Sequence, residues 1–306
     1  PVWSVFIMLV VRGIGSTFQQ PAIQSIIPQL VPADQLIKTN GWMQLMNAGS
    51  FLLGPVISAA LYAAFPMPVV LLSDVAGAIL ASLALAVVRV PELEKGQKTR
   101  ENPIIEYKEG LQVFLRDKKL FFLVLGEALC MFFYGPLSSF YPLMTSDYFD
   151  LSAMYGSAVE LSFAVGMILS SLLFSSILKV NRKVRVSYIG LFGMGITSAL
   201  CGVVPADFTG WLIFALLCVG LGASGNVHTI PLTAYIQETV EPAKMGRTFS
   251  VLTLISSVTM PLGLLLGSPI AEKVGVNVWF FVSGMAIVIM TAGVLSVYYL
   301  KYKKGE

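Results

Sequence analysis

The sequence predicts an all-α integral membrane protein, a polytopic bundle of helices. Apolar runs near twenty residues long, separated by short connectors, fill the 306 residues almost end to end. Because no water in the hydrocarbon core can satisfy a backbone amide, a run of about 18 or more apolar residues is typical of a spanning helix. The composition agrees, with 56% hydrophobic and 12% charged residues. These values exclude a soluble globular domain, in which apolar and charged faces alternate.

Nine runs are long enough to cross a bilayer, and we expect a transmembrane helix in each. They are Val2–Leu30, Trp42–Phe65, Pro68–Val90, Leu120–Thr145, Ser157–Leu178, Val186–Val204, Trp211–Gln237, Phe249–Ala271 and Val278–Leu300. One such run is also typical of a helix buried in a soluble core, but nine in succession are not. A polar stretch divides them, so we expect the last three helices of an N-terminal bundle in 1–91, a cytoplasmic connector with a short amphipathic helix in 92–119, and a six-helix bundle in 120–306.

The basic residues predict the orientation in the membrane. Cytoplasmic loops carry an excess of Lys and Arg, and 18 of the 20 basic residues fall in the odd-numbered connectors or the C-terminal tail. The even-numbered connectors carry Asp147, Asp150 and Asp207, with Lys273 as the one base. We therefore expect a multi-pass plasma-membrane protein whose C-terminus is cytoplasmic. The net charge of +3 follows from this topology and does not indicate nucleic-acid binding.

A pattern of Gly and Pro repeats between the two groups of helices. Glycines precede Pro21 in the first run and Pro231 in the seventh, and a second proline follows 11 residues later in each case, at Pro32 and Pro242. This match pairs the first three helices with the last three and leaves three helices without a counterpart. We therefore expect three further helices before Pro1, in a parent protein of twelve helices built from two parallel repeats.

Three motifs resemble those of major facilitator drug exporters. Residues Val11–Ser16, which include Arg12, are similar to the Arg-x-x-x-Gly motif of the fourth helix. Gly49–Ser58 resembles the fifth-helix antiporter motif, and Lys179–Arg185 resembles the second copy of the basic gating-loop motif. Other stretches are similar to the macrolide-efflux branch of this family, namely residues 21–32, 74–78, 160–167 and 275–280.

This resemblance covers essentially the whole chain and implies both a fold and a set of roles. The fold is a twelve-helix major facilitator bundle, of which this chain holds nine transmembrane helices. Arg12 is then expected to help couple protons to transport, and the alternative is a structural ion pair between helices. The motif positions expected to serve packing or gating are Gly13, Gly15, Gly54, Pro55, Arg182 and Lys183.

Four charged residues inside the apolar runs are candidates for proton coupling: Arg12, Asp74, Glu127 and Glu160. A charge at this depth costs at least about 2.5–3.5 kcal/mol, so such a residue usually has a function. Asp74 and Glu160 lie nearer the outer ends of their helices, where they either accept external protons or simply contact water and cap neighbours. For Glu127, the alternative to a functional role is a carboxyl kept neutral by burial.

Polar and aromatic side chains at helical spacing predict the wall of a substrate cavity. Glu127 heads one such face, and a carboxylate beside aromatic rings suits a bulky amphipathic cation. The alternative is that the Met and Tyr side chains of this face only pack. His228, the single histidine, is either a hydrogen-bonded structural residue or a proton or substrate site. The expected substrate-binding residues are Gln20, Gln24, Met131, Tyr134, Ser138, Asn226 and His228.

Together these observations predict a secondary exporter that works by alternating access and proton antiport. The expected partners are an amphipathic small molecule of the macrolide type, protons and the lipid bilayer, with no cofactor and no metal. A siderophore exporter or a proton-coupled symporter of the same fold is the nearest alternative. A membrane scaffold or sensor that transports nothing is the alternative from another class. The sequence offers no phosphate loop, metal-ligand spacing or nucleophile–base set, so we do not expect an enzyme.

Overall fold

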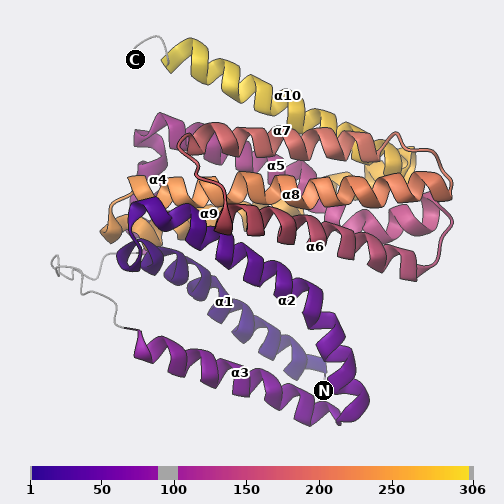
Figure 1. Cartoon of the computed structure of the whole chain (residues 1–306), viewed down its shortest axis with the longest axis horizontal. Coiled ribbons are helices and arrows are strands. Elements are labelled where there is room, and N and C mark those ends of the chain that lie inside the picture. Colours follow the sequence, from indigo (N-terminus) through magenta and orange to yellow (C-terminus); the bar gives the residue numbers. More distant parts are fainter. Residues whose placement is uncertain (1, 89–102, 303–306) are drawn as a thin grey trace.

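The computed structural model describes residues 2–88 and 103–302, and every regular element in these ranges is helical. The helices and their order are shown in Figure 1. The ten α-helices are α1 (Val2–Leu30), α2 (Leu36–Ala64), α3 (Met67–Val87), α4 (Pro103–Arg116), α5 (Lys118–Leu143), α6 (Ala153–Ser176), α7 (Lys183–Cys201), α8 (Phe208–Thr239), α9 (Pro242–Val274) and α10 (Val276–Tyr302). A 3-10 turn (Ala33–Gln35) precedes α2, and a π-helical turn (Met144–Tyr148) follows α5.

Seven segments of the described ranges are long and apolar enough to cross a membrane. They contain α2 and the six helices α5 to α10. In α3 the corresponding apolar stretch is shorter and covers Leu72–Val87. The all-helical membrane fold is thus confirmed, whereas the full set of nine transmembrane helices stays a prediction.

Polar caps explain why two helices begin earlier than their apolar runs. Asp117 accepts hydrogen bonds from the backbone N–H groups of Lys119 (2.8 Å) and Leu120 (3.2 Å), so α5 begins at Lys118. Asp207 likewise accepts from Gly210 N–H at 2.7 Å at the start of α8. A carboxylate at this position accepts hydrogen bonds from the unpaired amides of the first turn, and its negative charge interacts favourably with the positive end of the helix dipole.

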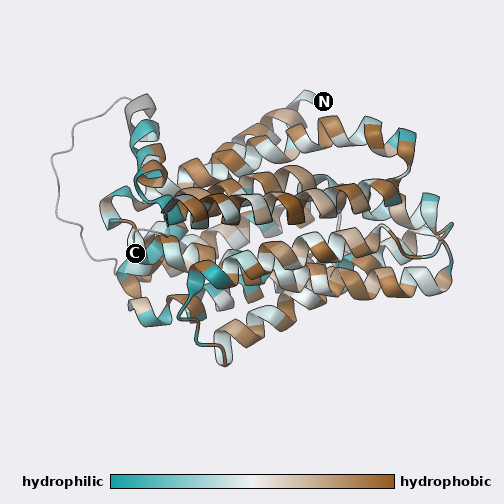
Figure 2. Cartoon of the chain, turned by 90° about the horizontal axis from the view of Figure 1, so that it is seen from above, coloured by the Kyte–Doolittle hydropathy of each residue, from teal (hydrophilic) through white to brown (hydrophobic). Residues whose placement is uncertain are grey.

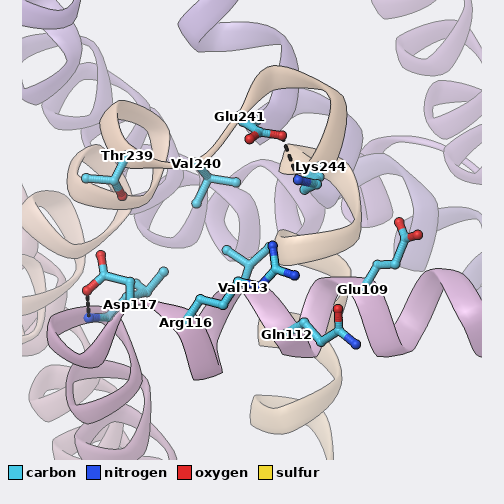
Figure 3. A pocket seen from close by; sticks show the side chains of 10 residues that line it. Glu109, Gln112, Val113, Arg116, Asp117, Thr239, Val240, Glu241 and Lys244 are labelled. Atoms are coloured by element: carbon cyan, nitrogen blue, oxygen red, sulfur yellow. Dashed lines mark hydrogen bonds and ion pairs between the residues drawn. The ribbon is translucent and has the colours of Figure 1, made fainter. Parts of the chain in front are cut away.

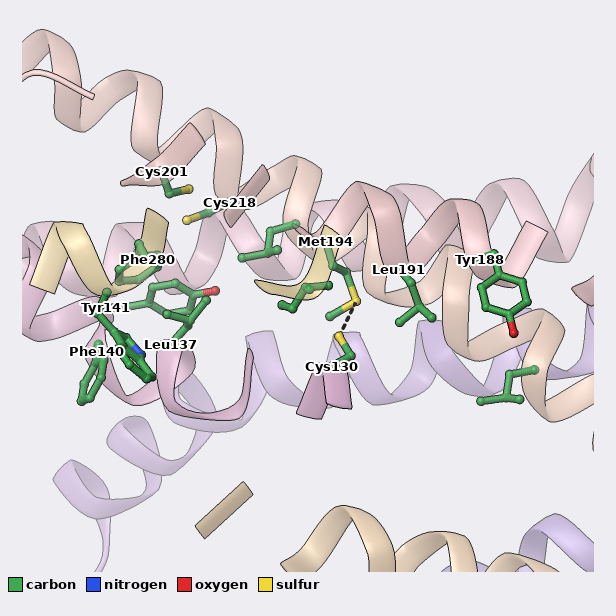
Figure 4. Packing of buried hydrophobic residues seen from close by; sticks show 14 of the residues in the cluster. Cys130, Leu137, Phe140, Tyr141, Tyr188, Leu191, Met194, Cys201, Cys218 and Phe280 are labelled. Carbon is green, nitrogen blue, oxygen red and sulfur yellow. Dashed lines mark hydrogen bonds between the residues drawn. The ribbon is translucent and has the colours of Figure 1, made fainter. Parts of the chain in front are cut away.

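The helices α5 to α10 form one packed bundle with a continuous apolar core (Figure 4). Small residues allow close approach: a Cβ at Gly166 of α6 would overlap the Val219 carbonyl of α8, and one at Gly222 would overlap the Phe163 carbonyl. The three cysteines are buried and free, and the Cys130 thiol donates to the Met194 sulfur at 3.9 Å. The thiols therefore serve as core side chains.

The helices α1 to α3 form a second group, which diverges from this bundle toward the end of the molecule at which the N-terminus lies (Figure 1). At the opposite end α2 packs on α6 and α8, while α1 packs on α9. The amphipathic helix expected in the connector is α4, which packs on the first turns of α9, where Arg247 pairs with Glu109. The rest of the connector up to residue 102 lies outside the described residues. Hydrophobic residues dominate the middle of the long helices, and hydrophilic residues gather toward their ends and on α4 (Figure 2).

Candidate functional site

A buried carboxylate–imidazole pair lies inside the C-terminal bundle. Glu127 of α5 and His228 of α8 are 101 residues apart in sequence, and their Oε2 and Nε2 atoms are 2.6 Å apart. The side chain of His228 is 1% exposed and that of Glu127 is 12% exposed. Two residues that the sequence offered as separate candidates therefore form one site, shielded from bulk water on the imidazole side.

Ser187 of α7 completes this site from the other side of the imidazole ring. Its Oγ lies 2.7 Å from His228 Nδ1 and also donates to the His228 carbonyl at 3.1 Å. The Ser187 carbonyl is a second partner of Nδ1, again at 3.1 Å. Both ring nitrogens are thus hydrogen-bonded, and the imidazole is held between α5 and α7 in a fixed orientation.

This network accommodates protons in more than one arrangement. A neutral imidazole can donate from Nε2 to the Glu127 carboxylate and accept at Nδ1 from Ser187 Oγ. A doubly protonated ring can donate to Glu127 and to the Ser187 carbonyl, while Ser187 Oγ donates to the His228 carbonyl. Since both ring nitrogens and Ser187 Oγ keep a partner in either case, the imidazole can stay in place in both protonation states.

The close contact between α7 and α8 depends on Gly190. A Cβ at this position would overlap the backbone nitrogen and Cα of His228. Only a residue without a side chain lets α7 approach near enough for Ser187 to reach the imidazole. The local sequence of α7 therefore positions His228, although Gly190 has no side chain that could bond to it.

A second polar network joins the two helix groups. Asn40 of α2, which is 3% exposed, donates to the Gln237 side-chain oxygen of α8 at 2.6 Å. Gln237 in turn donates to the side-chain oxygen and the backbone carbonyl of Gln24 in α1, each at 3.1 Å. The buried apolar side chains around this network are Ile27, Leu36, Ile37, Phe174, Ile230 and Ala234. We call these six residues and the three polar ones the closing cluster.

The closing cluster is expected to hold α1 and α2 against α8. Gln237→Leu keeps the size of the side chain but leaves the buried Asn40 amide without its acceptor on α8, which costs about 1–3 kcal/mol. The equilibrium constant for closing α1 and α2 against α8 should therefore fall by about 5- to 150-fold. A cysteine placed at Ile37, which is now 6% exposed, should then react faster with a water-soluble maleimide.

Gln29→Leu is the matched control, because within residues 2–88 and 103–302 the Gln29 amide donates only to the Ser25 carbonyl of its own helix, at 2.9 Å. The native cysteines are buried and give little background. Unchanged labelling in Gln237→Leu would show that the polar network does not stabilise the closed arrangement.

The remaining substrate candidates are dispersed. Asn226 is 2% exposed, and its amide donates to the Met167 carbonyl and to Ser170 and Ser171, so it fastens α8 to α6. Gln20 is exposed on α1, whereas Gln24 lies in the closing cluster. Met131 and Tyr134 are half-buried on α5, and the exposed Ser138 donates to the Gly135 carbonyl.

The other charged and motif candidates lie away from the carboxylate–imidazole pair. Asp74 on α3 and Glu160 on α6 are exposed, and the side chain of Arg12 on α1 lies outside the described part of the structure. Lys183 donates to Glu238 at 2.6 Å, and Arg182 precedes the first turn of α7. A Cβ at Gly13, Gly15 or Gly54 would meet no described atom within 4 Å, and Pro55 is exposed within α2.

Sequence reasoning missed Ser187, Gly190 and Asn40 as site residues. Ser187 offered one signal, since it is a polar residue near the start of the apolar run Val186–Val204, whereas Asn40 lies among polar residues before the run that begins at Trp42. Such residues usually bond to their own helix, so the sequence does not distinguish one that reaches a neighbouring helix.

A surface pocket of about 540 Å³ lies elsewhere, between α4 and the turn from α8 to α9 (Figure 3). Lys244 donates to Glu241 there at 2.7 Å, and this hydrogen bond with its positive charge lowers the pKa of the exposed Glu241 carboxyl. The residues that line the pocket include neither Glu127 nor His228.

Comparison with known proteins identifies the family. The sequence model of the Major Facilitator Superfamily matches residues 1–264. The chain belongs to the Major Facilitator Superfamily. Macrolide efflux protein A of Streptococcus pyogenes is 36% identical to this transporter over 289 residues, which are 94% of the chain and 71% of that protein. The protein of the same name from Enterococcus faecalis is 35% identical over 265 residues, or 86% and 81% of the two chains.

A solved structure supports the fold of this major facilitator protein independently. The crystal structure of a bacterial homologue of the iron transporter ferroportin in its outward-facing state superposes with a TM-score of 0.73. The match covers 93% of this chain and 69% of that one, at 15% sequence identity. The family match and the 35–36% identity to the two macrolide efflux proteins confirm the resemblance to macrolide-efflux transporters: the protein is a multi-pass membrane transporter and not an enzyme.

Proposed function

We propose that this transporter exports amphipathic small molecules of the macrolide type in exchange for protons. The observation that carries the proposal is the buried Glu127–His228 pair inside the six-helix bundle, which we assign as the proton site. The name of the Streptococcus pyogenes relative supports the substrate class and the direction. We call the end of the bundle at which α5, α7 and α9 begin the basic end, because Lys118, Lys183 and Lys244 lie there. Since cytoplasmic loops carry an excess of Lys and Arg, this end then faces the cytoplasm.

The proton and the cationic substrate compete for one negative charge, and this competition couples proton entry to substrate export. With the carboxylate ionised and the imidazole neutral, the pair carries a negative charge that attracts an amphipathic cation. One more proton on the imidazole or the carboxyl makes the pair neutral and weakens that attraction. Met131 and Tyr134 continue along α5 from Glu127 and supply apolar and aromatic area for the substrate. A proton entering from outside therefore favours release of the substrate there.

The closing cluster supplies the conformational part of the cycle. In the structure it joins α1 and α2 to α8 at the basic end, while the same helices diverge toward the other end (Figure 1). Access from the cytoplasm requires the hydrogen bonds of Gln237 to Gln24 and Asn40 to break. Since one helix, α8, carries both Gln237 and His228, a movement that opens the cluster also acts on the proton site.

Transport in everted membrane vesicles tests this function. A vesicle interior made acidic should drive uptake of a radiolabelled macrolide, and a protonophore should abolish that uptake. Trypsin should cleave near the exposed Arg182 in everted vesicles and not in intact cells, which checks the orientation. Uptake that persists without a pH gradient, or that needs ATP, contradicts proton antiport. Absence of any uptake favours a non-transporting scaffold.

A further inference from the structure

A cavity of about 900 Å³ opens between α7, α8 and α10 at the basic end of the bundle. Its lining includes neither Glu127 nor His228, nor any residue of the closing cluster. The cavity is therefore distinct from the proton site and from the contact between the two helix groups. Four basic side chains line it, those of Lys119, Arg182, Lys183 and Arg185.

The charge of this cavity is strongly positive. Its one acidic lining residue is Glu238, which already accepts a hydrogen bond from Lys183 at 2.6 Å. Arg182 and Arg185 are both exposed, and neither forms an ion pair with a carboxylate of the described residues. Two guanidinium groups with five N–H donors each are therefore available to an anion.

A buried phenol adds a directed donor to these cations. Tyr188 lines the cavity and is 4% exposed, yet its hydroxyl makes no hydrogen bond with any described residue. Figure 4 shows Tyr188 at the end of the core opposite Cys201. Tyr235, in contrast, is already engaged, because its hydroxyl donates to Asp117 at 3.1 Å. Although the Tyr188 side chain as a whole is buried, its hydroxyl is open to the cavity and can donate a hydrogen bond to an anion there.

The first turn of α7 also favours an anionic ligand. Arg182 stands at its N-cap and gives no side-chain hydrogen bond, so the amides that follow have no cap. Unpaired amides and the helix dipole favour an anion at this place. A phosphate or phosphodiester, with several acceptor oxygens, can accept from the guanidinium groups, from Tyr188 and from these amides.

Apolar side chains beside the cations decide which phosphate fits. Ile189, Phe192 and Leu295 line the same cavity, and Ile189 is 56% exposed on α7. Tyr299, 46% exposed on α10, also lines it. A cluster of basic and Tyr side chains above an apolar, lipid-facing surface is typical of the boundary between headgroups and acyl chains.

We propose that this cavity binds the headgroup of an anionic phospholipid such as phosphatidylglycerol. The phosphodiester lies between Arg182, Arg185 and the Tyr188 hydroxyl, and an acyl chain runs along Ile189 toward the middle of the membrane. The bound lipid stabilises α7, the helix that carries Ser187 and Gly190 and so positions His228. The proposal concerns binding alone and does not depend on the direction or the substrate of transport.

Lipid binding to the purified protein in detergent tests this assignment by native mass spectrometry and by thermal unfolding. Phosphatidylglycerol should bind and raise the unfolding temperature, whereas phosphatidylcholine should not. The double variant Arg182→Gln, Arg185→Gln should bind phosphatidylglycerol about 5- to 30-fold more weakly, as expected for two cations near an anionic headgroup. Tyr188→Phe removes one hydroxyl and should weaken binding to a smaller extent.

Lys244→Gln is the matched control, since it removes a basic residue that lines the other pocket. It should bind phosphatidylglycerol as the wild type does. The unfolding temperature without lipid reports whether each variant is folded. Equal binding by the wild type, the double variant and Tyr188→Phe overturns the proposal. A shift of the same size with inorganic phosphate also overturns it, because the cavity would then be a site for a soluble anion.

Discussion

Replacement of Glu127 with Gln is expected to abolish transport driven by a pH gradient while the protein stays folded. The amide keeps the shape of the side chain and can still bond to His228 Nε2, now 2.6 Å from the carboxylate, but it cannot carry a proton or a charge. Binding of a cationic substrate should weaken by about 1–3 kcal/mol, or about 5- to 150-fold, whereas a neutral substrate should bind almost as before. Purified protein in liposomes, assayed with one cationic and one neutral substrate, measures both effects.

Three further variants separate a proton site from a general effect of charge. Glu272→Gln removes an exposed carboxylate near the end of α9 and should leave transport unchanged. His228→Asn should lose gradient-driven transport, and the double variant Glu127→Gln, His228→Asn should lose little more, because the two residues act as one site. Full gradient-driven transport of both substrates by Glu127→Gln would remove this pair from the mechanism. A fall in abundance alone would assign it a structural role.

Substitution of Gly190 with Ala is expected both to destabilise the protein and to disrupt the Glu127–His228 site. The added Cβ would overlap backbone atoms of His228, so α7 and α8 must separate and the contact of Ser187 with the imidazole is lost. Overpacking of this kind costs about 1–3 kcal/mol, and the broken hydrogen bonds add to it. Thermal unfolding of the purified protein should show a clearly lower midpoint, and transport should fall with it.

Gly225→Ala is the matched control for this substitution. It lies on α8, and a Cβ there would meet no described atom within 4 Å. Since Ala favours a helix over Gly by up to about 1 kcal/mol, this variant should unfold at the same temperature as the wild type or higher. If both variants lower the midpoint equally, the close contact at Gly190 is not what limits stability.

Much of the fold was predictable because the bilayer sets the length of an apolar run. The first run, Val2–Leu30, has the bounds of α1, and the connector helix α4 was expected from its amphipathic pattern. Helix ends were less predictable: α9 begins at Pro242 and not near Phe249, because its first turns are polar and continue beyond the apolar stretch. Hydropathy detects the part of a helix that lies in hydrocarbon and not its full extent.

The site was predictable residue by residue but not as an assembly. Glu127 and His228 were both candidates, since a charge or an imidazole inside an apolar helix is costly. Their contact was not predictable, because helical periodicity shows which residues share a face and not which helix that face meets. For the same reason the sequence did not predict the hydrogen bonds of Gln237 to Gln24 and Asn40, which join three helices.

Proton release on substrate binding tests the exchange mechanism most directly. The protein is placed in weakly buffered detergent solution near neutral pH, and a saturating amphipathic cation is added while a pH indicator is followed. If substrate and proton compete for the Glu127–His228 pair, binding should release protons from the wild type, and the release should shrink as the starting pH rises. Glu127→Gln should bind more weakly and release none. Substrate binding by the wild type without proton release, or equal release from Glu127→Gln, would contradict proton exchange at this site.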